Sequence, residues 1–155
     1  MSSGSLPLIS RFAALLAALG CWATAWVPIS STRPDAPFTI EYGLFDHQID
    51  NPMAIVLAAT WLVTLLAGLA WLPGAPRWWP FVALAAVAVQ IATAILHALP
   101  TGVFWDGMDE FGNPTGGYEE ILPATGWWLL VLATALMLLA ALVPLVRRRR
   151  APRGR

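Results

Sequence analysis

Four long apolar segments separated by polar stretches account for most of the chain. They run from about 12 to 29, 53 to 72, 80 to 99 and 125 to 146, and none of them contains Asp, Glu, Lys or Arg. Each is close to the roughly 20 residues that an α-helix needs to cross about 30 Å of hydrocarbon. The pattern therefore predicts an all-α membrane protein, a four-transmembrane-helix bundle that occupies residues 1–155 as a single domain.

The connections between these segments differ in length. The stretch 73–79 is so short that the second and third helices are expected to be antiparallel neighbours. The connections 30–52 and 100–124 are too long for simple turns. Residues 37–42 alternate like a short strand, whereas 107–117 is rich in Gly, Asn and Pro and is expected to be irregular. We expect these two long loops to form a small cap over one end of the bundle.

Charge divides the two predicted ends of the bundle. All nine carboxylates lie in the two long loops, whereas of the nine basic residues, all of them arginines, only Arg33 does. Arg11, Arg77 and the arginines of the tail 147–155 fall on the other side of the apolar segments. This positive-inside distribution predicts cytoplasmic N- and C-termini and acidic outer loops. With arginine as the only basic residue, which is associated with GC-rich genomes, we expect a multi-pass protein of a bacterial cytoplasmic membrane.

The first apolar segment also resembles a secretory signal peptide. Arg11 precedes an apolar run that leads to an A-x-A pattern at 23–25, and residues 18–21 are similar to a lipobox. However, Ala18 stands three residues before Cys21, where a lipobox usually has leucine, and the apolar run continues beyond the cleavage point. These features favour an uncleaved helix.

The two long loops carry related sequences. Residues 43–46 lead to Asp-Asn-Pro at 50–52, and residues 102–106 lead to Asp109 and then Asn-Pro at 113–114. Each loop and the two helices that flank it would form one helical hairpin. If the two hairpins pack as parallel repeats about an axis along the membrane normal, the chain is a tandem duplication. Alternatively, both loops simply use Gly, Asn and Pro as turn formers.

The acidic loops contain a candidate metal site. Carboxylate oxygens suit Ca²⁺, and an imidazole would also permit zinc or copper. The candidate ligands are Asp46, His47, Asp50, Asp106, Asp109 and Glu110. Their spacing matches no defined motif, and we favour the interpretation that these residues simply solvate an outer loop. We therefore predict no cofactor and keep a divalent cation as the alternative.

Polar side chains fall on one face of two neighbouring helices. Gln90, Thr93 and His97 recur at i, i+3 and i+7 in the third segment, and Thr60 and Thr64 at i and i+4 in the second. This polar seam would either line a proton, quinone or small-solute pathway or supply interhelical hydrogen bonds worth about 0.6–2 kcal/mol. We favour the packing role.

Other features suit contacts with lipid or with another helix. A small-residue face recurs at four-residue spacing in the first segment and would allow close helix approach; it comprises Ala13, Ala17, Cys21 and Ala25. A basic run after the fourth segment would bind anionic headgroups at about 1 kcal/mol per residue; it comprises Arg147, Arg148, Arg149 and Arg150. Tryptophans near the helix ends are expected to anchor at the membrane interfaces; they are Trp22, Trp26, Trp71, Trp78, Trp79, Trp127 and Trp128.

The sequence shows no nucleophile–base pair and no phosphate-binding loop, so enzymatic activity is not expected. A single cysteine excludes an intramolecular disulfide, and nucleic acid is not an expected partner. The leading hypothesis is a non-catalytic accessory or assembly subunit of a larger membrane complex, with the lipid bilayer and other membrane subunits, or itself, as partners. The alternatives are a minimal oligomeric transporter or channel that uses the polar seam, and an outward-facing divalent-cation-binding protein.

Overall fold

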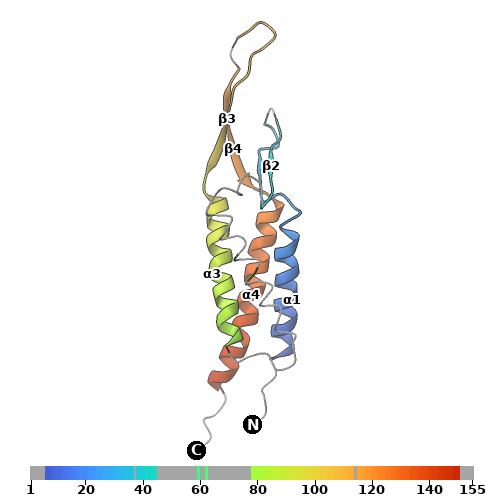
Figure 1. Cartoon of the computed structure of the whole chain (residues 1–155), viewed down its shortest axis with the longest axis vertical. Helices are drawn as coiled ribbons and strands as arrows, with labels where there is room; N and C mark the ends of the chain where they lie inside the picture. The colour runs from blue at the N-terminus through green and yellow to red at the C-terminus, as the bar shows by residue number, and fades with distance from the viewer. Residues whose placement is uncertain are drawn as a thin grey trace, which may run out of the picture.

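The computed structural model describes residues 6–36, 38–44, 59, 62, 78–113 and 115–150. Its helices are α1 (Leu8–Ala23), α3 (Trp79–Ala98) and α4 (Thr125–Arg150), and its strands are β1 (Ser30–Thr32), β2 (Glu41–Tyr42), β3 (Thr101–Trp105) and β4 (Gly117–Pro123). The helices lie side by side, and the strands rise beyond one end of them, the strand end (Figure 1). At the opposite end, the basic end, α1 begins and α4 finishes with its run of arginines.

The prediction of an all-α four-helix bundle is wrong. The described part of the chain holds three helices and a four-stranded antiparallel sheet in the order β2-β1-β4-β3. Two of these helices, α3 and α4, are long and apolar enough to cross a membrane, and α1 is a shorter apolar helix. The predicted second span, 53–72, lies outside the described residues apart from Ala59 and Leu62, which are helical.

The sheet forms because the two long loops pair with each other. β1 comes from the first loop and pairs with β4 from the second, with Ser30 opposite Pro123 and Thr32 opposite Ile121. This pairing gives the backbone N–H and C=O groups of both loops hydrogen-bond partners that neither loop supplies alone. Of the strand predicted over 37–42, only Glu41 and Tyr42 belong to β2.

The second loop is a long hairpin, whose two strands were not predicted, and the described residues of its connecting stretch are irregular, as expected for 107–117. β3 and β4 pair from Thr101–Ile121 to Trp105–Gly117, and the Gly- and Asn-containing stretch between them only connects the two strands. Aromatic and β-branched residues such as those of β3 favour strands. The tandem duplication gains no support, because most of the related part of the first loop, 43–52, lies outside the described residues.

The first helix ends earlier than the apolar segment that contains it. α1 stops at Ala23, and the Thr24 hydroxyl donates a hydrogen bond to the Cys21 carbonyl at 2.5 Å. Pro28 restricts the residue before it to extended conformations, which turns the chain out of the helix. The next residue, Ile29, donates its N–H to the Tyr42 carbonyl and accepts the N–H of Ala124, both at 2.9 Å.

Small side chains allow α4 to pack closely against both α1 and α3. One core cluster includes Ala14 and Ala17 of α1, Trp79 of α3, and Met137 and Ala140 of α4. A second cluster, nearer the sheet, comprises Cys21, Ile29, Leu44, Leu130 and Ala133, with Ala94 and Trp127 packed against it. The two clusters join the helices to each other and to the base of the sheet.

Candidate functional site

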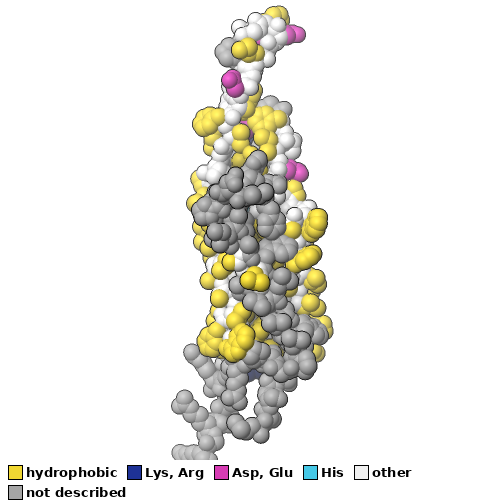
Figure 2. Space-filling view, in the orientation of Figure 1, with side chains coloured by type: hydrophobic (Ala, Val, Ile, Leu, Met, Phe, Trp, Pro, Cys, Tyr) yellow, Lys and Arg dark blue, Asp and Glu magenta, His cyan; other side chains and the backbone are white. Residues whose placement is uncertain are grey.

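Large apolar side chains cover the outer surfaces of the described helices. The exposed residues of this apolar belt include Leu8, Ile9, Phe12, Leu16 and Leu19 on α1, Phe81, Ile91, Ile95 and Leu96 on α3, and Leu132, Leu138, Leu139 and Leu142 on α4. Figure 2 shows hydrophobic side chains at several levels between the two ends of the helical body. Monomeric soluble proteins rarely expose contiguous apolar patches larger than a few hundred Å². The belt therefore fits contact with lipid or with other proteins better than contact with water.

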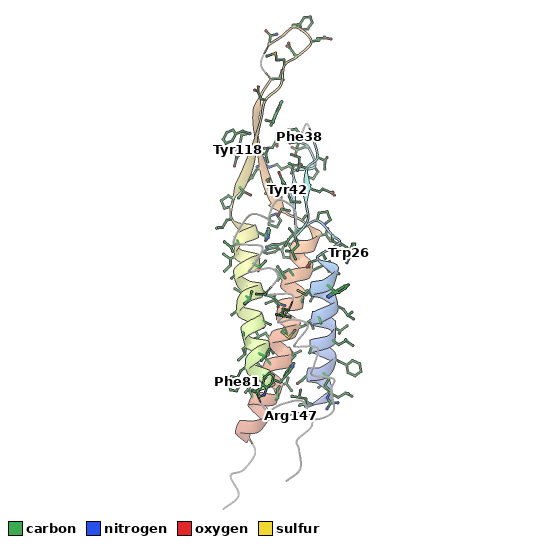
Figure 3. The ribbon with its side chains drawn as sticks, in the orientation of Figure 1. Trp26, Phe38, Tyr42, Phe81, Tyr118 and Arg147 are labelled. Atoms are coloured by element: carbon green, nitrogen blue, oxygen red, sulfur yellow. The ribbon has the colours of Figure 1, made fainter. Side chains whose placement is uncertain are left out.

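The charged residues that the structure describes lie at the two ends of the molecule. The described carboxylates are at the strand end, where Figure 2 shows them on the strands and their connections; they are Asp35, Glu41, Asp106, Asp109, Glu110, Glu119 and Glu120. Arg147 lies at the basic end, far from Tyr42 and Tyr118 of the sheet (Figure 3). Between these ends, the described helices carry no charged residue from Phe12 to Ala23 on α1, along α3, or from Thr125 to Val146 on α4.

Exposed tryptophans lie near both ends of the helices. Trp26 is 80% exposed and Trp128 is 64% exposed near the strand end, and Trp78 is 57% exposed at the start of α3. Trp79 differs from its neighbour, because it is buried in the first core cluster and not placed as a surface anchor. Sequence reasoning missed this burial, although Trp79 has helical spacing to Ala83 and Ala86, which are also buried.

The polar seam contributes to packing between helices. Gln90 and Thr93 are buried, and the Gln90 side-chain amide donates to Cys21 Sγ at 3.9 Å. The Thr93 hydroxyl donates to the Val89 carbonyl of its own helix at 3.0 Å. His97 is partly exposed, and its buried Nε2 has no hydrogen-bond partner among the described residues. Thr60 and Thr64 lie outside the described residues.

The contact between Gln90 and Cys21 joins the polar seam to the small-residue face, which sequence reasoning treated separately. Ala13, Ala17 and Cys21 are buried on α1, whereas Ala25 lies in the turn after the helix. In the basic run, Arg147 is exposed. The structure describes only the helical backbone of Arg148, Arg149 and Arg150.

The proposed metal ligands do not form one site in the described structure. Asp46, His47 and Asp50 lie outside the described residues, and among those described no group of three or more His, Cys, Asp or Glu side chains is placed to hold a metal. Asp109 instead shapes the hairpin loop. Its Oδ1 accepts the N–H groups of Phe111 at 2.9 Å and Asn113 at 2.8 Å, and its Oδ2 accepts the Asn113 side-chain amide at 2.8 Å.

An ion pair links the two long loops. Arg33 donates to Oε2 of Glu120 in β4, and this hydrogen bond is the main cause that raises the Arg33 pKa. The pair borders a polar cavity of about 230 Å³, which is lined by Arg33, Asp35, Tyr118, Glu119 and Glu120. Sequence reasoning missed this contact, although Arg33 is the only basic residue in the two acidic loops.

The two faces of the β3–β4 hairpin (residues 101–123) differ. Phe104 and Tyr118 are opposite each other in the register, with ring centroids 5.1 Å apart, and both are exposed. On the other face, Trp105 makes an edge-to-face contact with Phe38 of the first loop, with centroids 5.7 Å apart. One face therefore rests on the first loop, and the other carries unburied aromatic rings.

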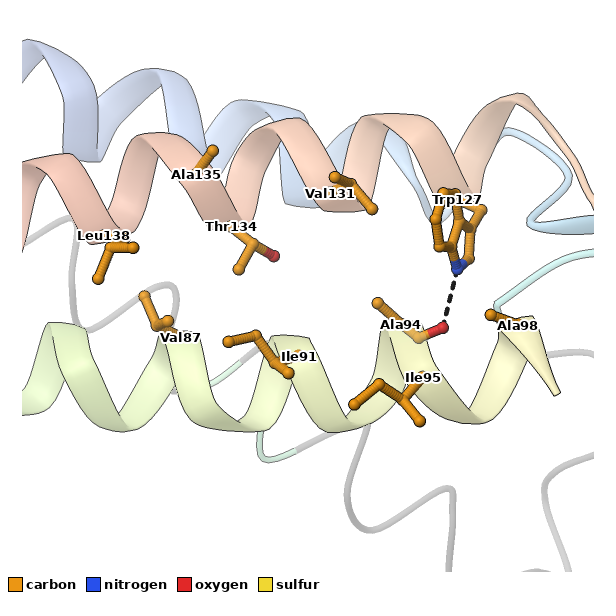
Figure 4. A pocket seen from close by; sticks show the side chains of 10 residues that line it. All are labelled: Val87, Ile91, Ala94, Ile95, Ala98, Trp127, Val131, Thr134, Ala135 and Leu138. Atoms are coloured by element: carbon orange, nitrogen blue, oxygen red, sulfur yellow. Dashed lines mark hydrogen bonds between the residues drawn. The ribbon is translucent and has the colours of Figure 1, made fainter.

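An apolar groove lies between α3 and α4, with a volume of about 300 Å³ (Figure 4). Its lining residues are Val87, Ile91, Ala94, Ile95, Ala98, Trp127, Val131, Thr134, Ala135 and Leu138. The Trp127 indole N–H donates to the Ala94 carbonyl at 2.8 Å, and the Thr134 hydroxyl donates to the Leu130 carbonyl at 2.7 Å. Because both polar side chains are satisfied within the helices, the groove fits apolar groups and offers no binding site for an ion.

No protein-family model matches the chain, and no curated protein or solved structure matches it either. Its function must therefore be inferred from the features described above. These are the apolar belt, the separation of charge between the two ends, and the projecting hairpin.

Proposed function

We propose that this chain is an integral membrane protein whose helices lie in the bilayer and whose sheet projects from it. The apolar belt carries this proposal, because a bilayer solvates such a surface directly. The 20 residues of α3 extend over about 30 Å, the thickness of the hydrocarbon core. α1 has 16 residues and extends over about 24 Å, a mismatch that local thinning of the bilayer accommodates.

We infer the orientation from the charges. The arginines of the basic end face the cytoplasm, and the acidic sheet lies on the outer side of a bacterial cytoplasmic membrane. The exposed tryptophans near the two ends of the helices support this placement, since indole rings prefer the two interfaces.

Within this membrane setting we assign the chain a non-catalytic role as an accessory or assembly subunit of a larger complex. Two surfaces support such a role, namely the apolar groove and belt inside the membrane and the hairpin outside it. A transport pathway through the polar seam has less support, because Gln90 and Thr93 are buried in helix contacts and none of the described seam residues, Gln90, Thr93 and His97, lines the groove.

Cysteine accessibility tests both the membrane placement and the orientation. In intact cells an impermeant maleimide should label Thr115→Cys, in the hairpin loop, but should label Arg147→Cys, at the basic end, only after permeabilisation. Both positions are exposed. The wild-type chain serves as the unlabelled control, because its single cysteine, Cys21, is buried. Labelling of Arg147→Cys in intact cells would overturn the orientation. Release of the chain from membranes by alkaline carbonate would overturn the membrane placement.

A further inference from the structure

We infer that the β3–β4 hairpin docks into an apolar cleft with a basic rim on a partner protein at the outer face of the membrane. This inference rests on the proposed function, which places the hairpin outside the bilayer. The docking surface comprises Phe104, Met108, Phe111 and Tyr118, together with the carboxylates around them.

The apolar part of this docking surface is unusually exposed for side chains of its size. Phe104 is 83% exposed, Phe111 81% and Met108 79%, and Tyr118 is 53% exposed. The hairpin extends well beyond the end of the helices (Figure 1), so a bilayer around the apolar belt would not cover these residues. Aromatic residues and methionine are enriched in the cores of protein–protein interfaces. A partner that buried them would remove a large apolar area from water.

The backbone of the hairpin loop is already ordered for binding. Besides the bonds to its carboxylate, Asp109 donates its N–H to the Asn113 carbonyl at 3.0 Å, and Thr115 donates its N–H to the Gly107 carbonyl at 2.7 Å. Gly112 takes a positive φ of 81°, which glycine adopts without strain. Because these bonds fix Phe111 within a defined loop, binding loses less conformational entropy than it would for a flexible segment.

The negative charge of the hairpin indicates which kind of partner it would bind. Residues 101–123 contain five carboxylates and no basic residue, namely Asp106, Asp109, Glu110, Glu119 and Glu120. Glu120 is paired with Arg33. A basic rim around an apolar cleft would complement this surface and speed association. A second copy of the hairpin, a nucleic acid or an anionic lipid surface would instead repel it, since like charges brought together at an interface are costly.

Photocrosslinking of the full-length chain in native membranes tests this inference. Benzoylphenylalanine replaces Phe104 or Phe111, and replacing Glu41, which is exposed on β2, provides the control. Positions 104 and 111 should crosslink to one protein, identified by mass spectrometry, at a peptide that contains Lys or Arg, and position 41 should not. Crosslinking to a second copy of this chain, crosslinking to lipid, or no crosslink would overturn the inference.

The identified protein is then purified and titrated against the full-length chain in nanodiscs. Phe104→Ser and Glu110→Lys should each weaken binding about tenfold or more. Glu41→Lys, the same charge change on β2, should leave binding nearly unchanged. Raising the salt to about 1 M, where the Debye length is about 3 Å, should also weaken binding. Equal affinities for all three variants, or binding that salt does not affect, would overturn the inference.

The maleimide result at position 115 separates this inference from the proposed function. If Thr115→Cys is labelled from outside and no protein crosslink forms, docking is wrong and the membrane placement stands. If Thr115→Cys is labelled only after permeabilisation, the proposed orientation is wrong and docking at the outer face fails with it.

Discussion

At the residue scale, Asp109 shows how one side chain determines the shape of an exposed loop. Hydrogen bonds from the side chain and backbone of Asn113 lower the Asp109 pKa, with smaller contributions from the backbone of Phe111 and Gly112. Such bonds favour the charged carboxylate over its protonated form. The ordered loop and the ionised state of Asp109 therefore stabilise each other.

This coupling predicts a pH dependence confined to the hairpin loop. Because the folded pKa is lowered, the stabilisation is fully present above the unfolded pKa of about 3.9 and is lost as the pH falls through the lower folded value. In NMR spectra of the detergent-solubilised protein, the amide resonances of Phe111 and Asn113 should stay constant from neutral pH to about pH 5 and shift below about pH 4. Asp109→Ala should disturb these resonances at every pH, whereas Glu110→Gln should leave the wild-type profile intact. An unchanged spectrum for Asp109→Ala would contradict the role of this side chain.

At the element scale, the helices were easier to predict than the strands. Each helix satisfies its backbone hydrogen bonds within one apolar segment, so α3 and α4 follow from a local pattern. The sheet instead pairs Ser30 with Pro123, two positions far apart in the chain, which no local periodicity indicates. The Asx-type loop at Asp109 did have a local indication, since Asp, Gly and Asn within five residues favour such turns. Sequence reasoning instead considered the carboxylates there only as solvated loop residues or as an alternative metal site.

The junction between the helices and the sheet predicts a steric effect at Gly126. This residue donates its N–H to the Pro28 carbonyl at 2.8 Å, and an added Cβ would lie 2.7 Å from the same oxygen and 2.8 Å from the Val27 carbonyl oxygen. Gly126→Ala should therefore force the start of α4 away from the segment after α1. We expect a destabilisation of about 1–3 kcal/mol, measured as a lower midpoint of thermal unfolding in detergent.

Gly20→Ala is the matched control for this steric effect. Its added Cβ would lie 3.3 Å from Ala133 Cβ, a contact between two side-chain atoms that a small shift relieves. Alanine also favours a helix by up to about 1 kcal/mol over glycine. The unfolding midpoint of Gly20→Ala should therefore stay near that of the wild type. Equal midpoints for both variants would show that Gly126 is not a point of close approach.

At the scale of the whole molecule, the two long loops act as one unit above the helices. β1 and β4 join them through the sheet, Arg33 and Glu120 join them through an ion pair, and Trp105 rests on Phe38. The hairpin is therefore held relative to the helical body and is not an independent tail. This arrangement would let a protein anchored in the bilayer present the docking surface at a fixed position above it.

In the proposed arrangement the helices contact lipid and the hairpin contacts water. The same substitution should therefore have opposite effects at an exposed position of each. Leu139 lies near the middle of α4 and is 47% exposed in the apolar belt, whereas Phe111 is 81% exposed in the hairpin loop. An arginine at the centre of a transmembrane helix costs about 2.5–3.5 kcal/mol during insertion, whereas at a water-exposed site it costs almost nothing. Leu139→Arg should therefore reduce the carbonate-resistant membrane fraction and the cellular abundance, and Phe111→Arg should leave both at wild-type levels. If Leu139→Arg were as abundant and as firmly integrated as the wild type, this part of the apolar belt would not face lipid, and the membrane placement of α4 would be wrong.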